Sequence, residues 1–240
     1  MNSPSPSSSL FKLLSPSVQQ SSRNVLKLFG SPSCVDTTRI QIVLHEKKIP
    51  YDIVNLDTLS DSKASELMAQ PFARASGPFI EEDGFILCES RAICRYVATK
   101  YADQGAKLIP DAYNIKRAAL FEQAVFTEVF DFEPYASKAV HEKVTKRLKG
   151  ITPDEAVFEA SIAGLSSKLE AYEDLLSRQR YLAGDELTLA DIYHIPGGAM
   201  LTNAGSDVMT RKGPNITRWW NEISSRPSWI AVQNGDAVQG

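Results

Sequence analysis

Residues 85–93 read Phe-Ile-Leu-Cys-Glu-Ser-Arg-Ala-Ile, and this strand-to-helix junction is the most informative feature of the 240-residue chain. A carboxylate and a hydroxyl, Glu89 and Ser90, stand where the apolar strand ends. The first backbone N–H groups of a helix have no partner within it, so Ser90 and those amides can accept a ligand carboxylate while Glu89 attracts an ammonium group. A free amino-acid end carries both groups. The pair also suits an ordinary capped helix with a solvated glutamate.

The composition excludes several classes of partner. The net charge is -3 and the 26 basic residues are spread along the chain, so we expect no nucleic-acid partner, which needs a clustered basic face. No apolar run approaches the roughly 20 residues that cross a bilayer, so we expect a soluble protein with no membrane partner. The three cysteines, Cys34, Cys88 and Cys94, are odd in number and lack metal-ligand spacing. They predict free thiols, no metal and a reducing, cytoplasmic compartment.

Residues 1–23 differ from the rest, with nine serines, three prolines and only Lys12 and Arg23 charged. This composition predicts a disordered tail. A Ser-rich, acid-free segment also fits an organelle transit peptide, although the prolines interrupt any amphipathic helix.

The pattern over residues 24–103 predicts a small α/β domain. An apolar strand at 25–29 is followed by a turn, a helix reaching Lys47–Lys48, a strand at 51–56 and a short helix at 60–68. Two further strands, 78–82 and 85–88, flank Asp83-Gly84, a pair that favours the tight turn of a hairpin. A helix over 89–101 completes the order β-α-β-α-β-β-α, which is typical of a mixed four-stranded sheet flanked by helices.

After a linker at 104–110, residues 111–232 lack strand signals and predict an all-helical domain, with a frayed tail at 233–240. The stretch 111–149 suits a helix pair with a bend near Pro134, and 154–178 carries an apolar stripe at helical spacing. Thr188 and Asp191 form a capping box in front of the apolar run 192–200. Trp219-Trp220 belong to a helix that we expect to end, as the last of the chain, at residues 224–227.

Together these motifs resemble the cytosolic glutathione transferases, and the phi class in particular. The matching residues include Leu28-Phe29-Gly30, Leu44-His45-Glu46-Lys47, Gln70-Pro71-Phe72, Glu89-Ser90-Arg91-Ala92-Ile93, Tyr96 to Tyr101, Thr188 with Asp191, His194-Ile195-Pro196, and Trp219-Trp220 with Ser225-Arg226-Pro227. The resemblance covers about residues 25–232. It implies a thioredoxin-like domain that binds glutathione, a helical-bundle domain that lines a cleft for an apolar co-substrate, and a homodimer.

By position, the resemblance gives Glu89 and Ser90 the γ-glutamyl end of glutathione. Pro78 lies where the family keeps a cis-proline, which would turn the backbone of Gly77 toward the cysteinyl part of the ligand. Pro78 also suits the start of an ordinary strand.

The position that activates the glutathione sulfur departs from the family. Members of this class place a serine hydroxyl there, and the matching residue is Cys34. A thiol donates a weaker hydrogen bond, but a helix N-terminus favours a thiolate, so Cys34 could form a mixed disulfide with glutathione. Alternatively Cys34 is inert, or Ser31 or Ser33 supplies the hydroxyl.

The glycine end of glutathione departs as well. Where the class usually offers a His-Lys pair, this chain has Asp61-Ser62, which would cost about 1 kcal/mol by repulsion unless Lys63 or Arg74 replaces the lost cation. The loop before Pro78 is two residues longer, and Ser76 replaces a glutamine.

For the co-substrate, we expect the aromatic segment with Phe126, Phe130 and Tyr135 to form one wall and Met200 the other; a helical aromatic stripe can equally be core. His194 is expected to satisfy a core hydrogen bond, and His45 to lie away from the sulfur. The predicted function is a glutathione S-transferase that conjugates an apolar electrophile or isomerises a double bond, as a dedicated step of specialised metabolism. The alternatives are a Cys34-dependent thiol transferase or reductase and a non-catalytic ligand carrier.

Overall fold

The computed structural model describes residues 25–58 and 77–238. Its sheet contains β1 (Leu26–Phe29), β2 (Tyr51–Val54), β3 (Phe79–Glu82) and β4 (Phe85–Cys88) in the order β2-β1-β3-β4. Strand β1 runs parallel to β2 and antiparallel to β3, and β3 pairs antiparallel with β4. The predicted mixed four-stranded sheet is confirmed.

The hairpin between β3 and β4 forms at the predicted Asp83-Gly84 turn. Both residues adopt positive φ angles, 52° and 82°, and the N–H of Gly84 donates to the Glu81 carboxylate at 3.0 Å. Positive φ at both central residues is the geometry that Asp-Gly supplies at little cost.

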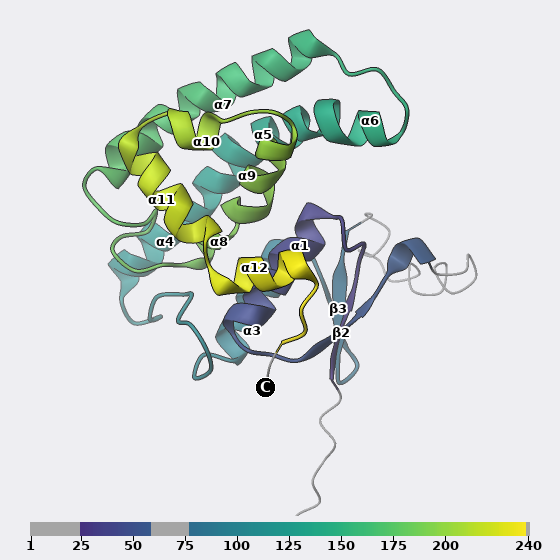
Figure 1. Cartoon of the computed structure of the whole chain (residues 1–240). Coiled ribbons are helices and arrows are strands. Elements are labelled where there is room, and N and C mark those ends of the chain that lie inside the picture. The colour runs from purple at the N-terminus through teal and green to yellow at the C-terminus, as the bar shows by residue number, and fades with distance from the viewer. Residues whose placement is uncertain (1–24, 59–76, 239–240) are drawn as a thin grey trace, which may run out of the picture.

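Two helices accompany the sheet on one side, α1 (Val35–Glu46) and α3 (Ser90–Lys100), and they pack against each other (Figure 1). A short 3-10 turn, η1 (Leu56–Thr58), follows β2. The helix predicted at 60–68 and the tail predicted at 1–23 lie outside the described residues.

Every described element after α3 is helical. These elements are α4 (Ile115–Thr127), η3 (Glu128–Phe132), α5 (Glu133–Val140), η4 (His141–Thr145), α6 (Lys146–Leu148), α7 (Glu155–Leu176), α8 (Leu189–Ile192), α9 (His194–Asn203), α10 (Val208–Arg211), α11 (Pro214–Ser224) and α12 (Pro227–Asn234). The sequence predicts a bend near Pro134 in the helical stretch 111–149. Here the α-helical hydrogen-bond pattern gives way to a π-helical one at η3, and Pro134 stands in the first turn of α5, directly after it. Proline has no backbone N–H to donate to the preceding turn, so a change in the helical hydrogen-bond pattern next to Pro134 is expected.

The prediction that the last helix ends at residues 224–227 is wrong. Helix α11 does end at Ser224, but Pro227 begins a further helix, α12, that continues to Asn234. The residue before a proline disfavours helical geometry, and Arg226 is accordingly extended, with φ -64° and ψ 138°. The proline therefore separates two helices rather than ending the helical region.

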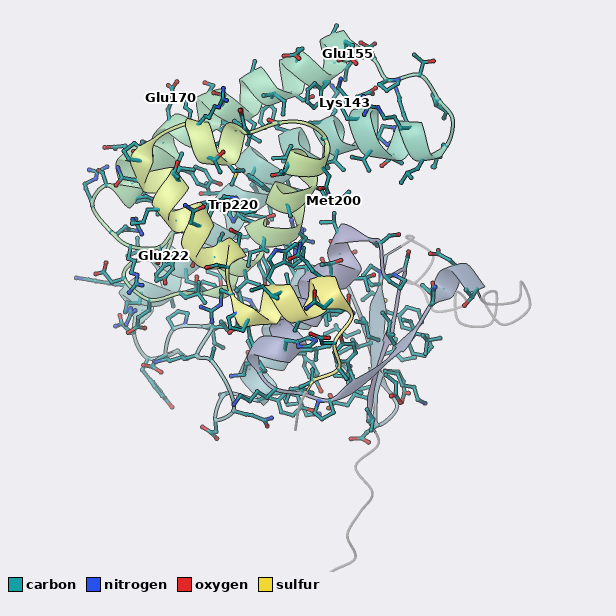
Figure 2. All side chains as sticks on the ribbon, in the orientation of Figure 1. Lys143, Glu155, Glu170, Met200, Trp220 and Glu222 are labelled. Atoms are coloured by element: carbon teal, nitrogen blue, oxygen red, sulfur yellow. The ribbon has the colours of Figure 1, made fainter. Side chains whose placement is uncertain are left out.

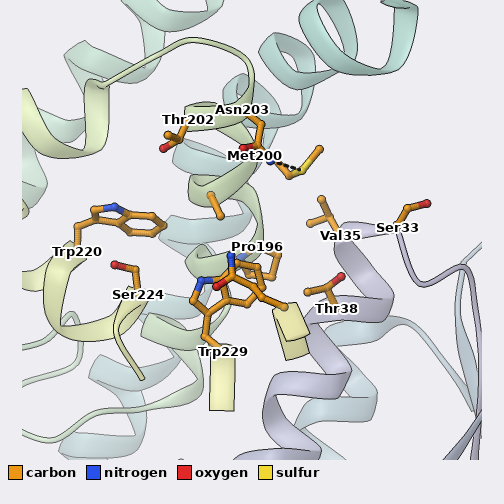
Figure 3. A pocket seen from close by; sticks show the side chains of 12 residues that line it. Ser33, Val35, Thr38, Pro196, Met200, Thr202, Asn203, Trp220, Ser224 and Trp229 are labelled. Carbon is orange, nitrogen blue, oxygen red and sulfur yellow. Dashed lines mark hydrogen bonds between the residues drawn. The ribbon is translucent and has the colours of Figure 1, made fainter. Parts of the chain in front are cut away.

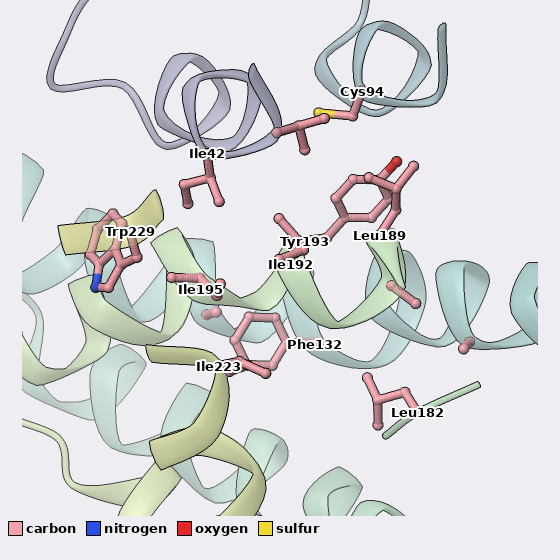
Figure 4. Close-up of a cluster of buried hydrophobic side chains, with 14 of the residues drawn as sticks. Ile42, Cys94, Phe132, Leu182, Leu189, Ile192, Tyr193, Ile195, Ile223 and Trp229 are labelled. Carbon is pink, nitrogen blue, oxygen red and sulfur yellow. The ribbon is translucent and has the colours of Figure 1, made fainter. Parts of the chain in front are cut away.

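Helix α1 lies between the sheet and the helical layer. It packs on α3 and also on α8, α9 and α12, and Figure 4 shows Ile42 of α1 facing the cluster that contains Ile195 and Trp229. At its C-terminal end, Glu46 accepts hydrogen bonds from Arg226 at 2.5 and 2.7 Å and from Ser228 at 2.5 Å. Helix α1 therefore contributes buried side chains both to the half of the molecule that contains the sheet and to the half that is all helical.

The outer surface of the helical layer carries ion pairs such as Lys143 with Glu155, which Figure 2 marks near the start of α7. Among the helices of residues 25–58 and 77–238, none combines the length and apolar character that crossing a membrane requires.

Candidate active site

The turn between β1 and α1 brings three predicted catalytic residues together. The hydroxyls of Ser31 and Ser33 lie 3.0 Å apart, and the N–H of Cys34 donates to the Ser31 carbonyl at 3.0 Å. Gly30 begins the turn because a Cβ there would lie 2.4 Å from the Thr37 hydroxyl and 3.1 Å from the Pro78 ring. The close approach of α1 to the start of β3 therefore requires a glycine.

Cys34 is the N-cap residue of α1. Its backbone is extended, with φ -79° and ψ 129°, and its side chain makes no capping hydrogen bond. The half-buried thiol is free and stands at the positive end of the α1 dipole. An anionic sulfur, whether of Cys34 or of a ligand, is favoured at this place.

Ser90 stands in the first turn of α3, but its hydroxyl already has a carboxylate partner. It donates to Asp36 Oδ1 at 2.6 Å and accepts from Arg39 Nη1 at 2.9 Å, and Arg39 also contacts Asp36. Burial acts to raise the pKa of Asp36, but Arg39, the Ser90 hydrogen bond and Arg91 together lower it. An internal carboxylate thus occupies the hydrogen bond that Ser90 would offer to a ligand.

Behind Ser90, two arginines and two glutamates join the sheet half to the helical half. Arg39 donates to Glu133 at 3.1 Å, and Arg91 donates to both oxygens of Glu128 at 2.7 Å and to Glu133 at 3.2 Å. Burial is the main cause of a raised pKa at Glu133. A charge in such a buried group is left without compensation if its partner moves away, which is costly. The ion pairs therefore favour one arrangement of α1, α3 and η3 relative to each other.

Glu89 lies directly before α3 with φ 71° and ψ 110°, a backbone conformation that non-glycine residues rarely adopt. Such a conformation costs on the order of 1–3 kcal/mol and persists only where the surroundings impose it. Its side chain is exposed beside the first turn of α3, as the predicted ammonium contact requires.

Gly77 and Pro78 lead into β3. Gly77 is exposed, and a Cβ added there would meet no atom within 4 Å, so its backbone faces open space. The expected cis bond is not found: the described residues contain no cis peptide bond, so Gly77–Pro78 is trans. Trans is the isomer that an X–Pro bond ordinarily favours, by about 0.5–1 kcal/mol.

Three residues of the predicted glutathione site, Lys63, Arg74 and Ser76, lie outside the described residues, as does Asp61, which is expected to weaken binding. The described part of the candidate site therefore consists of two regions. Ser31, Ser33 and Cys34 form the region predicted to hold the thiol, and Glu89 and Ser90 form the region predicted to hold the γ-glutamyl end.

The predicted co-substrate residues do not share the cavity that Met200 lines. Phe126 and Phe130 are 55% and 66% exposed, with their rings stacked 6.1 Å apart, and Tyr135 packs onto Gly164 of α7. Met200 instead lines a cavity of about 280 Å³ between α1 and the C-terminal helices (Figure 3). The cavity lining does not include the three aromatic side chains, because each is turned to solvent or to a neighbouring helix.

Sequence reasoning missed Asp36 and Arg39, which contact Ser90 directly. Their i, i+3 spacing on α1 looks like an ordinary surface ion pair, and only the packing of α1 on α3 reveals that Arg39 is fully buried. The other two thiols are both free, as predicted, but of the two expected core thiols only Cys94 lies in the core, where burial raises its pKa to about 12. Cys88 is half-buried, and burial raises its pKa as well. His45 stands near the C-terminal end of α1, away from the thiol turn.

Comparison with known proteins shows to which family the chain belongs. The model of the glutathione S-transferase N-terminal domain matches residues 24–99, and that of the C-terminal domain matches residues 128–227. The chain belongs to the glutathione S-transferase family, whose co-substrate is glutathione.

Within the family, its relatives are of the phi class. It is 36% identical over 209 residues to glutathione S-transferase hmp2 of Hypomyces subiculosus (86% of this chain, 96% of the relative) and 38% identical over 208 residues to glutathione S-transferase F11 of Arabidopsis thaliana (85% and 95%). The crystal structure of glutathione transferase F7 from Populus trichocarpa superposes with a TM-score of 0.78 at 35% identity, covering 88% of this chain and 99% of that one.

Proposed function

We propose that this protein is an active glutathione S-transferase that forms the glutathione thiolate at the N-terminus of α1 and delivers it to an apolar electrophile. The observation that carries the proposal is the convergence of two strand-to-helix junctions. Cys34 stands at the N-cap position of α1, Ser90 begins α3, and Asp36 of α1 contacts Ser90 directly. One amino-acid end held at Ser90 would leave the rest of a tripeptide running toward the α1 N-terminus.

Two physical effects would supply the catalysis. The α1 dipole and a donor at Ser31, Ser33 or Cys34 favour the thiolate over the thiol. Holding the thiolate beside a bound electrophile then replaces a bimolecular encounter by an oriented one.

Calorimetric titration of glutathione into the whole protein tests the binding half of the proposal. We expect saturable binding in the wild type, and weakening of at least about tenfold, or 1.4 kcal/mol, in Glu89→Gln, because this change removes the carboxylate that would contact the ammonium group of the ligand. Glu155→Gln is the matched control, since Glu155 is an exposed glutamate in the helical half. Absence of saturation at millimolar glutathione, with and without an aromatic electrophile present, would favour the carrier interpretation.

The finer activity that we propose is a dedicated step in specialised metabolism, either conjugation or isomerisation of a conjugated double bond. In isomerisation the thiolate adds to one alkene carbon, the resulting single bond rotates, and expulsion of the same thiolate restores the double bond without consuming glutathione. A dedicated substrate could supply binding energy that an altered glutathione site lacks. Mass spectrometry with a cis-enone distinguishes the two outcomes, since only conjugation yields a glutathione adduct.

Cys34 favours a second candidate, a thiol transferase, because its half-buried thiol makes no capping hydrogen bond. In this reaction the Cys34 thiolate attacks a glutathione mixed disulfide, a Cys34–glutathione disulfide forms, and the other thiolate leaves. A second glutathione then releases Cys34 as glutathione disulfide forms. Cys34→Ser should abolish disulfide reduction while retaining conjugation of 1-chloro-2,4-dinitrobenzene; retention of reduction would exclude this candidate.

For the whole protein we propose a cytoplasmic homodimer, on the strength of the family resemblance. Sedimentation equilibrium at micromolar concentration should give twice the mass of the chain, and a monomeric mass would contradict the proposal.

A further inference from the structure

The turn that joins α6 to α7, residues 146–151, has a defined backbone conformation. The N–H of Gly150 donates to the Arg147 carbonyl at 3.0 Å, and the N–H of Ile151 donates to the Lys146 carbonyl at 2.8 Å. Gly150 has a φ of 68°, and this pair of hydrogen bonds around a left-handed glycine is a common way for a helix to end. We call this segment the α6–α7 turn.

Two aliphatic side chains of the α6–α7 turn face solvent. Leu148 is 84% exposed and Ile151 is 51% exposed, and among the described residues no other leucine, isoleucine or valine is as exposed as Leu148. In turns of this type the residue after the glycine often packs back on an apolar residue of the helix, but the corresponding position here is Lys146. Leu148 and Ile151 therefore form an apolar pair that no described residue covers.

The segment around this apolar pair is basic. Residues 143–153 contain four basic residues and no acidic one. Two of the four have acidic partners, which are Glu155 for Lys143 and Glu142 for Lys146. The other two, Arg147 and Lys149, are exposed and form no ion pair with any residue that the structure describes. The turn thus presents positive charge beside its apolar pair.

The position of the α6–α7 turn bears on the kind of partner that it fits. Figure 1 shows α6 and the chain that leads from it into α7 at an outer edge of the helical layer. The interface of a lipid bilayer takes in apolar side chains without a preformed groove, and anionic headgroups attract lysine and arginine. The surface of an anionic membrane therefore matches both the exposed apolar pair and the charge beside it.

The charge on the rest of the chain favours contact through this turn alone. The whole chain carries -3 and residues 143–153 carry +4, so the remaining residues together carry -7. An anionic membrane repels acidic surfaces and attracts basic ones. The expectation of no membrane partner rests on the lack of an apolar run that could cross a bilayer, and adsorption on the surface needs no such run.

We propose that the α6–α7 turn adsorbs reversibly on membranes that contain anionic lipid, with Leu148 and Ile151 inserted among the headgroups and Arg147 and Lys149 against the lipid phosphates. The binding is weak, since even a myristoyl chain anchors a protein only marginally. Adsorption does not require transferase activity. It brings the protein close to apolar molecules, which collect in the bilayer.

Co-sedimentation of the whole protein with lipid vesicles tests the proposal. At low ionic strength, phosphatidylcholine vesicles that also contain phosphatidylserine should bind the wild type at least about tenfold more tightly than vesicles of phosphatidylcholine alone. Salt at about 1 M should remove most of this difference, because it shortens the Debye length to about 3 Å.

Two pairs of variants locate the contact. Lys149→Glu should weaken binding at least about tenfold, whereas Lys116→Glu, the same change at an exposed position in the first turn of α4, should not. Leu148→Ser should weaken binding about threefold or more, whereas Ile115→Ser, at a 79% exposed position, should bind as the wild type does. All four positions are exposed, so we expect each variant to fold.

Equal binding of the wild type to both kinds of vesicle, or binding to neither, would overturn the proposal. Equal weakening in Lys149→Glu and Lys116→Glu would overturn the location, because net charge alone would then control adsorption. Unchanged binding in Leu148→Ser would overturn the insertion of the apolar pair. A wild type that does not bind vesicles but binds polyglutamate, and loses that binding in Lys149→Glu, would instead indicate an acidic protein partner.

Discussion

At the scale of single residues, Asp36 is the side chain that holds the Ser90 hydroxyl inside the protein. Ser90 has one hydroxyl proton, and it points to Asp36 Oδ1 at 2.6 Å. A ligand carboxylate at the same place meets both a competing acceptor and a like charge. Arg39 offsets part of that repulsion because it contacts Asp36 and Ser90 together.

We predict that Asp36→Asn strengthens glutathione binding about three- to fivefold, because repulsion between like charges at a half-exposed position is worth up to about 1 kcal/mol. Calorimetric titration at neutral pH measures the change. Asp52→Asn, on the exposed face of β2, removes a charge elsewhere and should leave the affinity as in the wild type. Equal or weaker binding in Asp36→Asn would show that Asp36 assists the ligand rather than competing with it.

At the scale of elements, the start of α8 depends on the fully buried carboxylate of Asp191. It accepts hydrogen bonds from the backbone N–H groups of Thr188 and Leu182 and from the indole N–H of Trp219, each at 2.9 Å. Burial raises the pKa of Asp191, and these donors act to lower it. The capping box predicted from Thr188 and Asp191 is confirmed, and it also fixes α11 through Trp219.

Asp191→Ala should therefore cost about 3–5 kcal/mol, since several buried donors lose their acceptor at once. Urea unfolding at neutral pH measures the loss. Asp174→Ala is the control, because Asp174 is an exposed partner of Arg178 one helical turn away, and such a pair is worth about 0.5 kcal/mol or less. Similar costs for the two variants would mean that the box does not anchor α8.

Helix α9 begins with a histidine, His194, whose burial disfavours protonation in the folded state. Burial lowers the pKa of His194 to about 3, while its Nδ1 lies 2.8 Å from the Ala190 carbonyl and its Nε2 lies 3.2 Å from the Tyr172 hydroxyl. The carbonyl can only accept, so Nδ1 carries the proton and Nε2 accepts from Tyr172. The expected core role of His194 is confirmed.

Below pH 6.5 the unfolded chain binds a proton at His194 and the folded chain does not, so stability is lost as the pH falls from about 6.5 toward 3. We predict that His194→Gln, which cannot titrate, loses about 2 kcal/mol less stability than the wild type between pH 6.5 and pH 5. Urea unfolding of both proteins at the two pH values measures the difference. Equal losses of unfolding free energy in the wild type and in His194→Gln would show that His194 is protonated in the folded state.

Local patterns predicted most elements correctly because each depends on nearby residues. The Asp83-Gly84 pair favours a tight turn whatever the rest of the fold, and the capping box of Thr188 needs only Asp191, three residues further on. Helix α12 was missed because Pro227 can end or begin a helix, and only its packing on α1 decides. The role of Asp36 was missed for a related reason: its partner Ser90 lies 54 residues away.

At the scale of the whole molecule, α1 makes the two halves interdependent. It packs on α3 beside the sheet and on α9 and α12 of the helical layer, and Figure 4 shows Cys94 of α3, Ile42 of α1 and Tyr193 in one buried cluster. Neither half can expose its core without opening this shared face. We therefore expect a single unfolding transition for the described parts of the chain.

Reporters in the two halves test this expectation. The three tryptophans, Trp219, Trp220 and Trp229, all lie in the helical half, whereas Cys94 is fully buried in the sheet half. In a Cys34→Ser, Cys88→Ser background, alkylation of Cys94 by iodoacetamide and the change in tryptophan fluorescence should share one urea midpoint, because both require α1 to leave its place. Alkylation at a lower urea concentration than the fluorescence change would mean that the sheet half opens first and that α1 remains with the helical layer.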